Sequence, residues 1–255
     1  MEIVIDKWMG VIIALVFGML FGSFATMASY RIPRGEDLVV KRSGCPSCGH
    51  HLGFLDLFPL FSWLFNLGKC RYCKVAISCR YPLTEAFMAT LFVMVYLIYG
   101  FTLVSLPIYA LVVVLVIITV IDFEHQIIPD ILQIAIIPIG ILYRYNAESE
   151  LSEYFTGPLA GLFISLSLRY GFWLWKKKEG LGMGDVKFFA VAGLFLGIQG
   201  FVPFMLMSGL MGIFTSLIWK KLGKGPEFPF APALIASLLL CILFPEHSMS
   251  IMEIR

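Results

Sequence analysis

Four acidic residues lie within or beside long apolar stretches of the sequence: Glu85, Asp122, Asp130 and Asp185. Acidic side chains are costly in a bilayer, so residues placed there are candidates for function. Asp122 and Asp185 are predicted at the same depth, at the cytosolic edge of two different helices. A close pair of carboxylates shares one proton, because two like charges do not both ionise cheaply. The ionised member can take a proton from water while the other donates a hydrogen bond to a scissile carbonyl, which is aspartyl protease chemistry.

Glycines precede the second acid in "GLGMGDVKFF" (180–189), and they would let the backbone approach a substrate strand closely. Asp185 is expected near a helix N-terminus, which favours its ionised form, whereas Asp122 closes a helix. We therefore expect Asp185 to act as the base and Asp122 as the protonated partner. Simpler roles remain open: Asp185 as an ordinary N-cap, and Asp122 as a carboxylate that reaches into the membrane interface. The roles of Glu85, Asp130 and Arg169 are also open; Glu85 is a possible partner of Arg169 or Arg80.

The strongest local pattern is a double cysteine motif. Cys45 and Cys48 occur in "CPSCGH", and Cys70 and Cys73 occur in "CRYC". Two C-x-x-C pairs at this separation can place four thiolates around one tetrahedral ion, as in zinc ribbons. Four sulfur ligands leave no open position, so a structural Zn²⁺ is predicted. Disulfides or free cysteines are the alternatives, and a reducing cytosol argues against disulfides.

The elements that position these residues are predicted to be membrane helices. Hydrophobic residues make up 59% of the chain and charged residues 14%, whereas soluble domains are about a quarter charged. The net charge of +2 gives no reason to expect a nucleic-acid partner. An all-α polytopic membrane protein in contact with lipid is therefore the predicted class.

Apolar runs of about the length needed to cross a bilayer predict about eight transmembrane helices. Their approximate bounds are 9–30, 83–99, 103–121, 127–143, 155–175, 182–198, 201–219 and 228–244. The chain is thus divided into a first span (1–30), a small zinc-ribbon-like domain (31–82) and a seven-span core with the two aspartates (83–255).

The distribution of basic residues predicts the orientation. With the N-terminus outside, the cytosolic loops 31–82, 122–126, 176–187 and 220–227 contain eight, none, four and three of the 19 lysine and arginine residues. This bias follows the positive-inside rule. The zinc domain is therefore expected in the cytosol of a multi-pass protein.

Several motifs together resemble the type IV prepilin leader peptidases, which belong to the G-x-G-D membrane aspartyl proteases. The resemblance covers nearly the whole chain. The motifs are "FGSFATMASYRIP" (21–33), "CPSC", "FPLFSWL", "CRYC", "ISCRYPLTE" (77–85), "IDFEHQIIPD" (121–130), "GLGMGDVKFFAVAGLFLG" (180–197) and "FPFAPAL" (228–234). Ala25 and Thr26 replace a usual Leu-Asn, and Ala231 replaces a usual glycine. Both departures are expected to lie away from the two aspartates.

The resemblance implies catalytic residues Asp122 and Asp185, and zinc ligands Cys45, Cys48, Cys70 and Cys73. It also implies a bacterial inner-membrane enzyme of type IV pilus or type II secretion systems. Such an enzyme cuts the basic leader from prepilins or pseudopilins after a glycine. Many members then methylate the new amino group with S-adenosylmethionine, but the sequence assigns no residues to this methyl donor, and it does not predict the oligomeric state.

Two alternatives remain at this stage. A presenilin-like or signal-peptide-peptidase-like protease shares the G-x-G-D motif, but it does not account for the paired C-x-x-C motifs. A transporter that uses membrane aspartates to relay protons or bind cations is the alternative from another class.

Overall fold

The computed structural model describes residues 6–39, 42–53, 55–178, 180–223 and 228–245. These residues form helices, apart from connecting segments and two isolated β-bridges, which confirms the predicted all-helical class. The chain divides into two units, Met1–Val120 and Ile121–Arg255. The first contains the cysteine motifs and the second contains both candidate catalytic aspartates.

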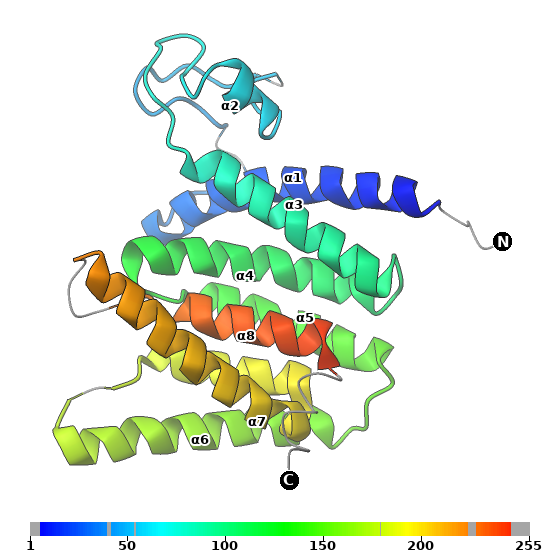
Figure 1. Ribbon diagram of the computed structural model, residues 1–255, viewed down its shortest axis with the longest axis vertical. Coiled ribbons are helices and arrows are strands. Elements are labelled where there is room, and N and C mark those ends of the chain that lie inside the picture. The colour runs from blue at the N-terminus through cyan, green and yellow to red at the C-terminus, as the bar shows by residue number, and fades with distance from the viewer. Residues whose placement is uncertain (1–5, 40–41, 54, 179, 224–227, 246–255) are drawn as a thin grey trace. The chain divides into compact units, whose positions relative to one another are not determined.

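The first unit is built on two packed helices, α1 (Lys7–Arg31) and α3 (Arg80–Tyr99), which lie side by side (Figure 1). They approach closely because small residues face the partner helix. A Cβ atom on Gly22 would lie 2.6 Å from the Cα atom of Glu85. Small residues at such a crossing allow membrane helices to pack through their backbones. A 3₁₀ turn, η1 (Ile32–Arg34), follows α1 directly.

The segment between these helices contains one short helix, α2 (Phe61–Phe65), and two similar knuckles. One bridge, Gly44 to His51, encloses the first C-x-x-C pair, and the other, Lys69 to Ala76, encloses the second. With so little regular structure, this segment has a small core of its own, which is typical of domains that a metal or disulfides stabilise.

The second unit starts in the last turn of α4 (Ser105–His125). It continues through α5 (Asp130–Asn146), α6 (Glu153–Lys176), α7 (Met183–Lys221) and α8 (Ala231–Leu243). Helices α6 and α7 cross where Gly157 faces Gly193: a Cβ atom on Gly157 would lie 2.1 Å from the Gly193 carbonyl oxygen. A larger residue at either position would force these two helices apart.

Helix α7 joins two predicted spans, 182–198 and 201–219, into one element of 39 residues. Gly197 breaks its helical geometry with φ +65° and ψ −175°. The buried side chain of Arg144 stabilises this break, because its Nε donates a 2.7 Å hydrogen bond to the Leu194 carbonyl oxygen and its Nη1 lies 2.5 Å from a Glu153 carboxylate oxygen. The two predicted spans are therefore two helices that meet at a kink, which lies at Gly197, close to the predicted boundary.

Among the residues that the structure describes, four helices are long and apolar enough to cross a membrane: α1 with its 3₁₀ extension, α3, α4 and α7. Helices α5 and α8 have only 17 and 13 residues, below the roughly 20 that a full crossing needs. In α6, Arg169 interrupts the apolar stretch between the charged end residues Glu153 and Lys176. The structure thus supports a multi-spanning helical protein, and the number of eight crossings remains a prediction.

Candidate functional site

Asp122 lies in the last turn of α4, and its side chain is buried, with 5% of its surface exposed. Its Oδ2 accepts a 2.9 Å hydrogen bond from the backbone N–H of Ala231, the first residue of α8. The N–H groups of a first helical turn have no partner within their helix, and they carry the positive end of the helix dipole. Asp122 therefore closes one helix and binds the N-terminus of another.

This contact corrects two expectations. The Ala231 replacement was expected to lie away from the aspartates, yet its amide binds one of them directly. Because the backbone makes the contact, alanine preserves it. The contact also places Asp122 at a helix N-terminus, as Asp185 is. Position along a helix therefore does not distinguish the two acids, and it gives no reason to assign the base role to Asp185.

Asp185 is the third residue of α7, and its side chain is partly buried. Its Oδ2 accepts a 3.2 Å hydrogen bond from the backbone N–H of Gly182, the residue that precedes the helix. This is one half of a capping box; glycine has no side chain to supply the other half. The simple N-cap alternative is thus incorrect in position, since Gly182 is the N-cap, but Asp185 does help to cap its helix.

The glycines around Asp185 serve packing more than unusual backbone geometry. Gly182 has φ −64°, which any residue can adopt, and Gly184 lies inside the helix. A Cβ atom on Gly184 would lie 3.3 Å from the Cβ of Ile128. A Cβ atom on Gly180 would lie 2.4 Å from the ring of Phe172. The absence of side chains therefore lets the start of α7 fit closely between its neighbours.

Helices α5 and α6 hold the start of α7 in place. Gln133 Nε2 donates a 3.2 Å hydrogen bond to the Gly184 carbonyl oxygen. Lys187 Nζ forms a 2.7 Å ion pair with Asp130, and Arg169 donates to the Leu181 carbonyl oxygen. The open roles of Asp130 and Arg169 are thereby explained as contacts that position the segment that carries Asp185.

The carboxylates of Asp122 and Asp185 interact electrostatically within the second unit. One closes α4 and the other opens α7, so two distant parts of the sequence supply the two acids. Each carboxylate accepts a backbone N–H at a helix N-terminus. Two acids that feel each other's charge are suited to holding one proton between them.

Glu85 has a different role from either pairing considered for it. It is buried in α3, and its Oε2 accepts a 2.7 Å hydrogen bond from the backbone N–H of Leu60. Arg80 instead donates to the Ser29 hydroxyl at 2.6 Å. Glu85 thus fastens the segment that leads into α2 to the second turn of a membrane helix.

The four motif cysteines form one cluster in the first unit. Their Sγ atoms all lie within 4.8 Å of one another, and Cys45 Sγ lies 3.8 Å from Cys73 Sγ. A tetrahedral zinc ion with Zn–S bonds of about 2.3 Å separates its sulfur ligands by about 3.8 Å. The thiols therefore fit a four-coordinate metal ion, with one buried and one exposed cysteine from each pair.

Matching backbone geometry presents the two cysteine pairs. The N–H of Cys45 bonds the His50 carbonyl oxygen at 3.0 Å, and the N–H of Cys70 bonds that of Val75 at 2.8 Å. The residue four positions after each first cysteine, Gly49 or Lys74, has a positive φ. The two knuckles are thus local repeats of one turn.

The knuckle backbone also affects the thiols directly. Backbone hydrogen bonds from Cys48 and Ser47 lower the pKa of Cys45 to about 7. For Cys73, a backbone hydrogen bond from Val75 lowers the pKa, but desolvation and the other thiols outweigh it and raise the pKa to about 11. Four thiols this close do not all ionise without a cation among them, which is the chemistry that a bound metal supplies.

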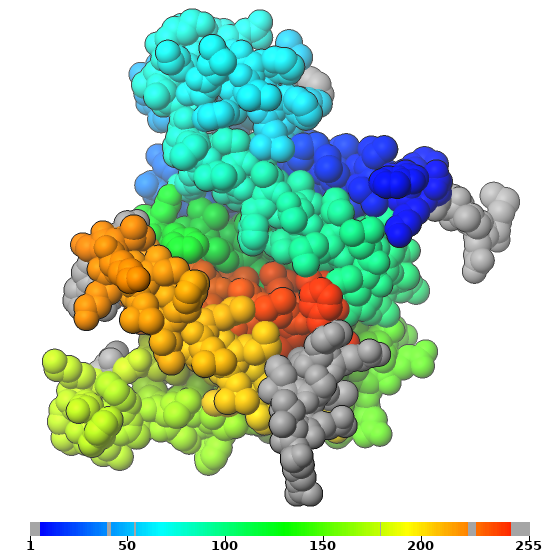
Figure 2. All heavy atoms as spheres, viewed as in Figure 1, coloured from blue at the N-terminus to red at the C-terminus, as the bar shows by residue number. Residues whose placement is uncertain are grey.

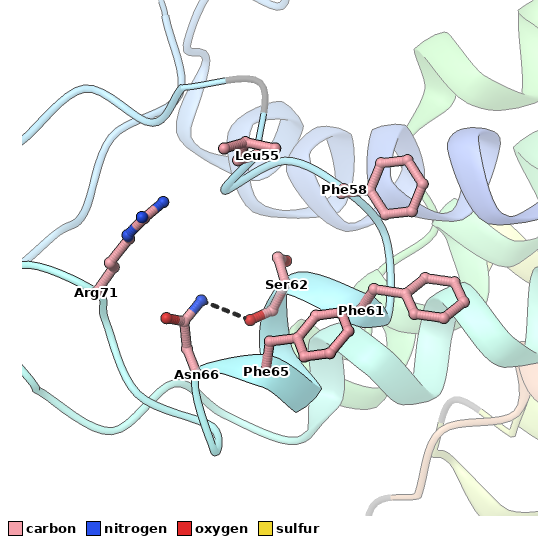
Figure 3. Close-up of a pocket in the computed structure, with 7 residues that line it drawn as sticks. All are labelled: Leu55, Phe58, Phe61, Ser62, Phe65, Asn66 and Arg71. Atoms are coloured by element: carbon pink, nitrogen blue, oxygen red, sulfur yellow. Dashed lines mark hydrogen bonds between the residues drawn. The ribbon is translucent and has the colours of Figure 1, made fainter.

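A pocket with a volume of about 370 Å³ lies beside these knuckles. Figure 3 shows three aromatic rings, Phe58, Phe61 and Phe65, on one side and the Arg71 guanidinium on the other. Asn66 lies between these sides, where its Nδ2 donates a 2.7 Å hydrogen bond to the Ser62 carbonyl oxygen. The sequence did not predict this pocket, because the "FPLFSWL" motif and the second C-x-x-C pair come together only in the fold.

The fold and these sites define a helical, multi-pass membrane protein with a paired-aspartate site and a four-thiol site. Comparison with known families agrees along the chain. Residues 16–99 match the bacterial peptidase A24 N-terminal domain, and residues 109–217 match the type IV leader peptidase family. The chain belongs to the type IV leader peptidase family, as its motifs predicted.

Individual relatives match over almost their whole length. A prepilin leader peptidase/N-methyltransferase of Aeromonas hydrophila is 31% identical over 267 residues, which cover 94% of this chain and 92% of the relative. The protein of the same name from Bacillus subtilis is 31% identical, with 93% and 96% covered. The one from Pseudomonas aeruginosa is 31% identical, with 93% and 91% covered. No solved structure matches the chain.

Proposed function

We propose that this protein is a membrane aspartyl endopeptidase that removes the basic leader from type IV prepilins or type II secretion pseudopilins. The observation that supports the proposal is that Asp122, at the end of α4, and Asp185, at the start of α7, lie in one unit where the charge of Asp185 acts on the Asp122 carboxylate. Membership of the leader peptidase family supports the same reaction. The presenilin-like and transporter alternatives explain neither the full-length relatives nor the four-cysteine cluster.

The two carboxylates would act as a pair. The ionised one takes a proton from water as the water oxygen attacks the scissile carbonyl carbon, and the protonated one donates a hydrogen bond to the carbonyl oxygen. When the C–N bond breaks, a proton passes from the pair to the departing nitrogen. The Ala231 and Gly182 amides hold the two acids in place during this exchange.

The membrane arrangement of the proposal follows the basic residues. We propose an N-terminus outside, about eight crossings in a bacterial inner membrane, and a cytosolic segment with the four cysteines. Asp122 and Asp185 would then lie at the cytosolic edge, where the leader of a prepilin meets its membrane helix. Zinc held by Cys45, Cys48, Cys70 and Cys73 would have a structural role, because four sulfur ligands leave no place for substrate.

The direct test uses membranes that contain the protein and a purified prepilin. Processing should shorten the prepilin on a gel, and mass spectrometry should place the new N-terminus immediately after a glycine. If the prepilin stayed unprocessed and the protein transported ions across the membrane, the transporter alternative would be supported and our proposal refuted.

We further propose that the protein methylates the new N-terminus, with S-adenosylmethionine as the methyl donor. The pocket in Figure 3 has suitable chemistry for this ligand. Aromatic faces attract organic cations, including sulfonium groups, and can stack on adenine. The Arg71 guanidinium suits the carboxylate of the methionine moiety. The donor, when bound, supplies the methyl group, and the residues of the pocket bind and orient it.

Replacement of Arg71 by alanine is expected to weaken S-adenosylmethionine binding by about 10- to 100-fold, because a charged hydrogen bond is lost. Equilibrium dialysis with labelled donor measures this, and mass spectrometry follows methylation of cleaved pilin. Lys74→Gln is the matched control, since it removes an exposed cation from the same knuckle but outside the pocket. Equal affinity in both variants would place the donor elsewhere.

A further inference from the structure

The second half of α7 carries a groove on its surface. It has a volume of about 380 Å³ and is lined by Gly209, Gly212, Ile213, Ser216, Leu217, Phe228 and Phe230. Small residues form its floor on α7, and the two phenylalanine rings, 6.2 Å apart, form a wall. This part of α7 (orange in Figure 2) lies at the surface of the unit, and the lining side chains of Ile213 and Leu217 are largely exposed, so the groove opens outward.

At Gly209, no side chain rises from the α7 backbone into the groove. A Cβ atom on Gly209 would have no neighbour within 4 Å, so the position faces open space. The neighbouring Gly212 is covered instead: a Cβ atom there would lie 2.6 Å from the Phe230 ring. Because residue 212 is a glycine, the Phe230 ring can lie directly against the α7 backbone.

One wall of the groove is linked to the acidic site through the chain. Phe230 lines the groove, and the next residue, Ala231, donates its backbone N–H to Asp122 Oδ2 at 2.9 Å. The Phe230 wall of the groove therefore lies a single residue along the chain from a contact to the candidate catalytic carboxylate.

We propose that this groove is an exosite for the apolar membrane helix of the prepilin substrate. The inference rests on the proposed peptidase function and adds where the part of the substrate after the cleavage point is held. The leader would extend into the cytosol, the scissile bond would lie at the aspartates, and the helix that follows would pack along α7.

Shape and chemistry favour a helix as the occupant. A helix is about 10 Å across, so a groove of this volume takes the side chains of one face. Membrane helices associate through small residues that allow close backbone approach, and Gly209 and Ser216 supply such a surface. From Gly209 to Ser216 the floor extends about 10 Å along α7, or two turns of a facing helix.

The test fills the groove without disturbing its walls. Gly209→Leu places a side chain where the structure has open space, and Gly171→Leu is the control, since a Cβ atom on that α6 glycine also meets nothing within 4 Å. We expect Gly209→Leu to lower kcat/KM for full-length prepilin by about tenfold, mainly by raising KM, because the leucine side chain would fill the space into which the substrate helix packs. Gly171→Leu should match the wild type.

A short peptide that spans the cleavage point but lacks the apolar helix separates this inference from the proposed function. Gly209→Leu should cleave it as fast as the wild type does. Equal loss on both substrates, or no loss on prepilin, would overturn the exosite. A wild type that cleaves neither substrate would overturn the peptidase function and the exosite with it.

Photo-crosslinking tests the same contact without turnover. A photoreactive residue replaces either Ile213, which lines the groove and is 61% exposed, or its neighbour Phe214, which does not line it and is 66% exposed. In an Asp185→Asn background, position 213 should crosslink to the apolar segment of prepilin and position 214 should not. Equal yields from both positions, or crosslinks from 213 to lipid alone, would overturn the proposal.

Discussion

Replacement of either Asp122 or Asp185 by asparagine is expected to lower the rate of prepilin cleavage by about 100- to 10,000-fold, the usual contribution of a positioned acid or base. Asparagine keeps the size of the side chain and an oxygen that can still accept the Ala231 or Gly182 N–H. It cannot exchange a proton with water or with the departing nitrogen. The fold should therefore persist while the chemistry fails, as measured by initial rates on purified enzyme with equal amounts of folded protein.

The double variant gives a sharper test of the pair. If the two acids act as one proton-sharing unit, removing both should be no worse than removing one, because the effects of such groups are not additive. Glu124→Gln is the control, since it neutralises an exposed carboxylate two residues from Asp122 and should retain nearly full activity. Activity near the wild-type level in either single variant would show that the two aspartates do not perform the reaction.

The sequence predicted the parts of the site that local patterns determine. The four cysteines come together because each C-x-x-C pair lies in its own short turn, and turns are local. Apolar runs located the long helices to within a few residues, since hydrophobic length reflects the bilayer. Asp122 and Asp185 were found because an acid beside such a run is conspicuous.

The contacts that hold the aspartates were not predictable in the same way. The Ala231 amide that binds Asp122 is 109 positions away in the sequence. A backbone N–H has no residue type, so no pattern marks it. The sequence predicted a break between residues 198 and 201, close to the kink at Gly197, but a glycine in an apolar run does not show whether the chain makes a loop or only a kink. The Arg144 side chain that stabilises the break lies on another helix.

Loss of the metal is expected to unfold the segment that contains the four cysteines while the membrane helices stay folded. Replacing any one of Cys45, Cys48, Cys70 or Cys73 by serine should reduce bound zinc from about one ion per chain to near zero, because three ligands hold structural zinc poorly. In its described residues, the segment has only one five-residue helix and two isolated bridges, so little else would keep it folded once the metal is lost. Elemental analysis of the purified protein measures the zinc content.

Proteolysis reports the structural consequence. Trypsin cleaves after basic residues, and Lys69, Arg71 and Lys74 all lie exposed in the second knuckle. Zinc should protect them by fixing the turn, and its removal by a chelator or by Cys70→Ser should speed cleavage there by about tenfold or more, since cleavage follows the population of the open form. Cys79→Ser is the matched control: Cys79 is exposed, precedes α3 and lies outside the cluster, so zinc and protection should both remain. A Cys70→Ser protein that keeps its zinc and resists trypsin would show that the four thiols do not form the metal site that their geometry indicates.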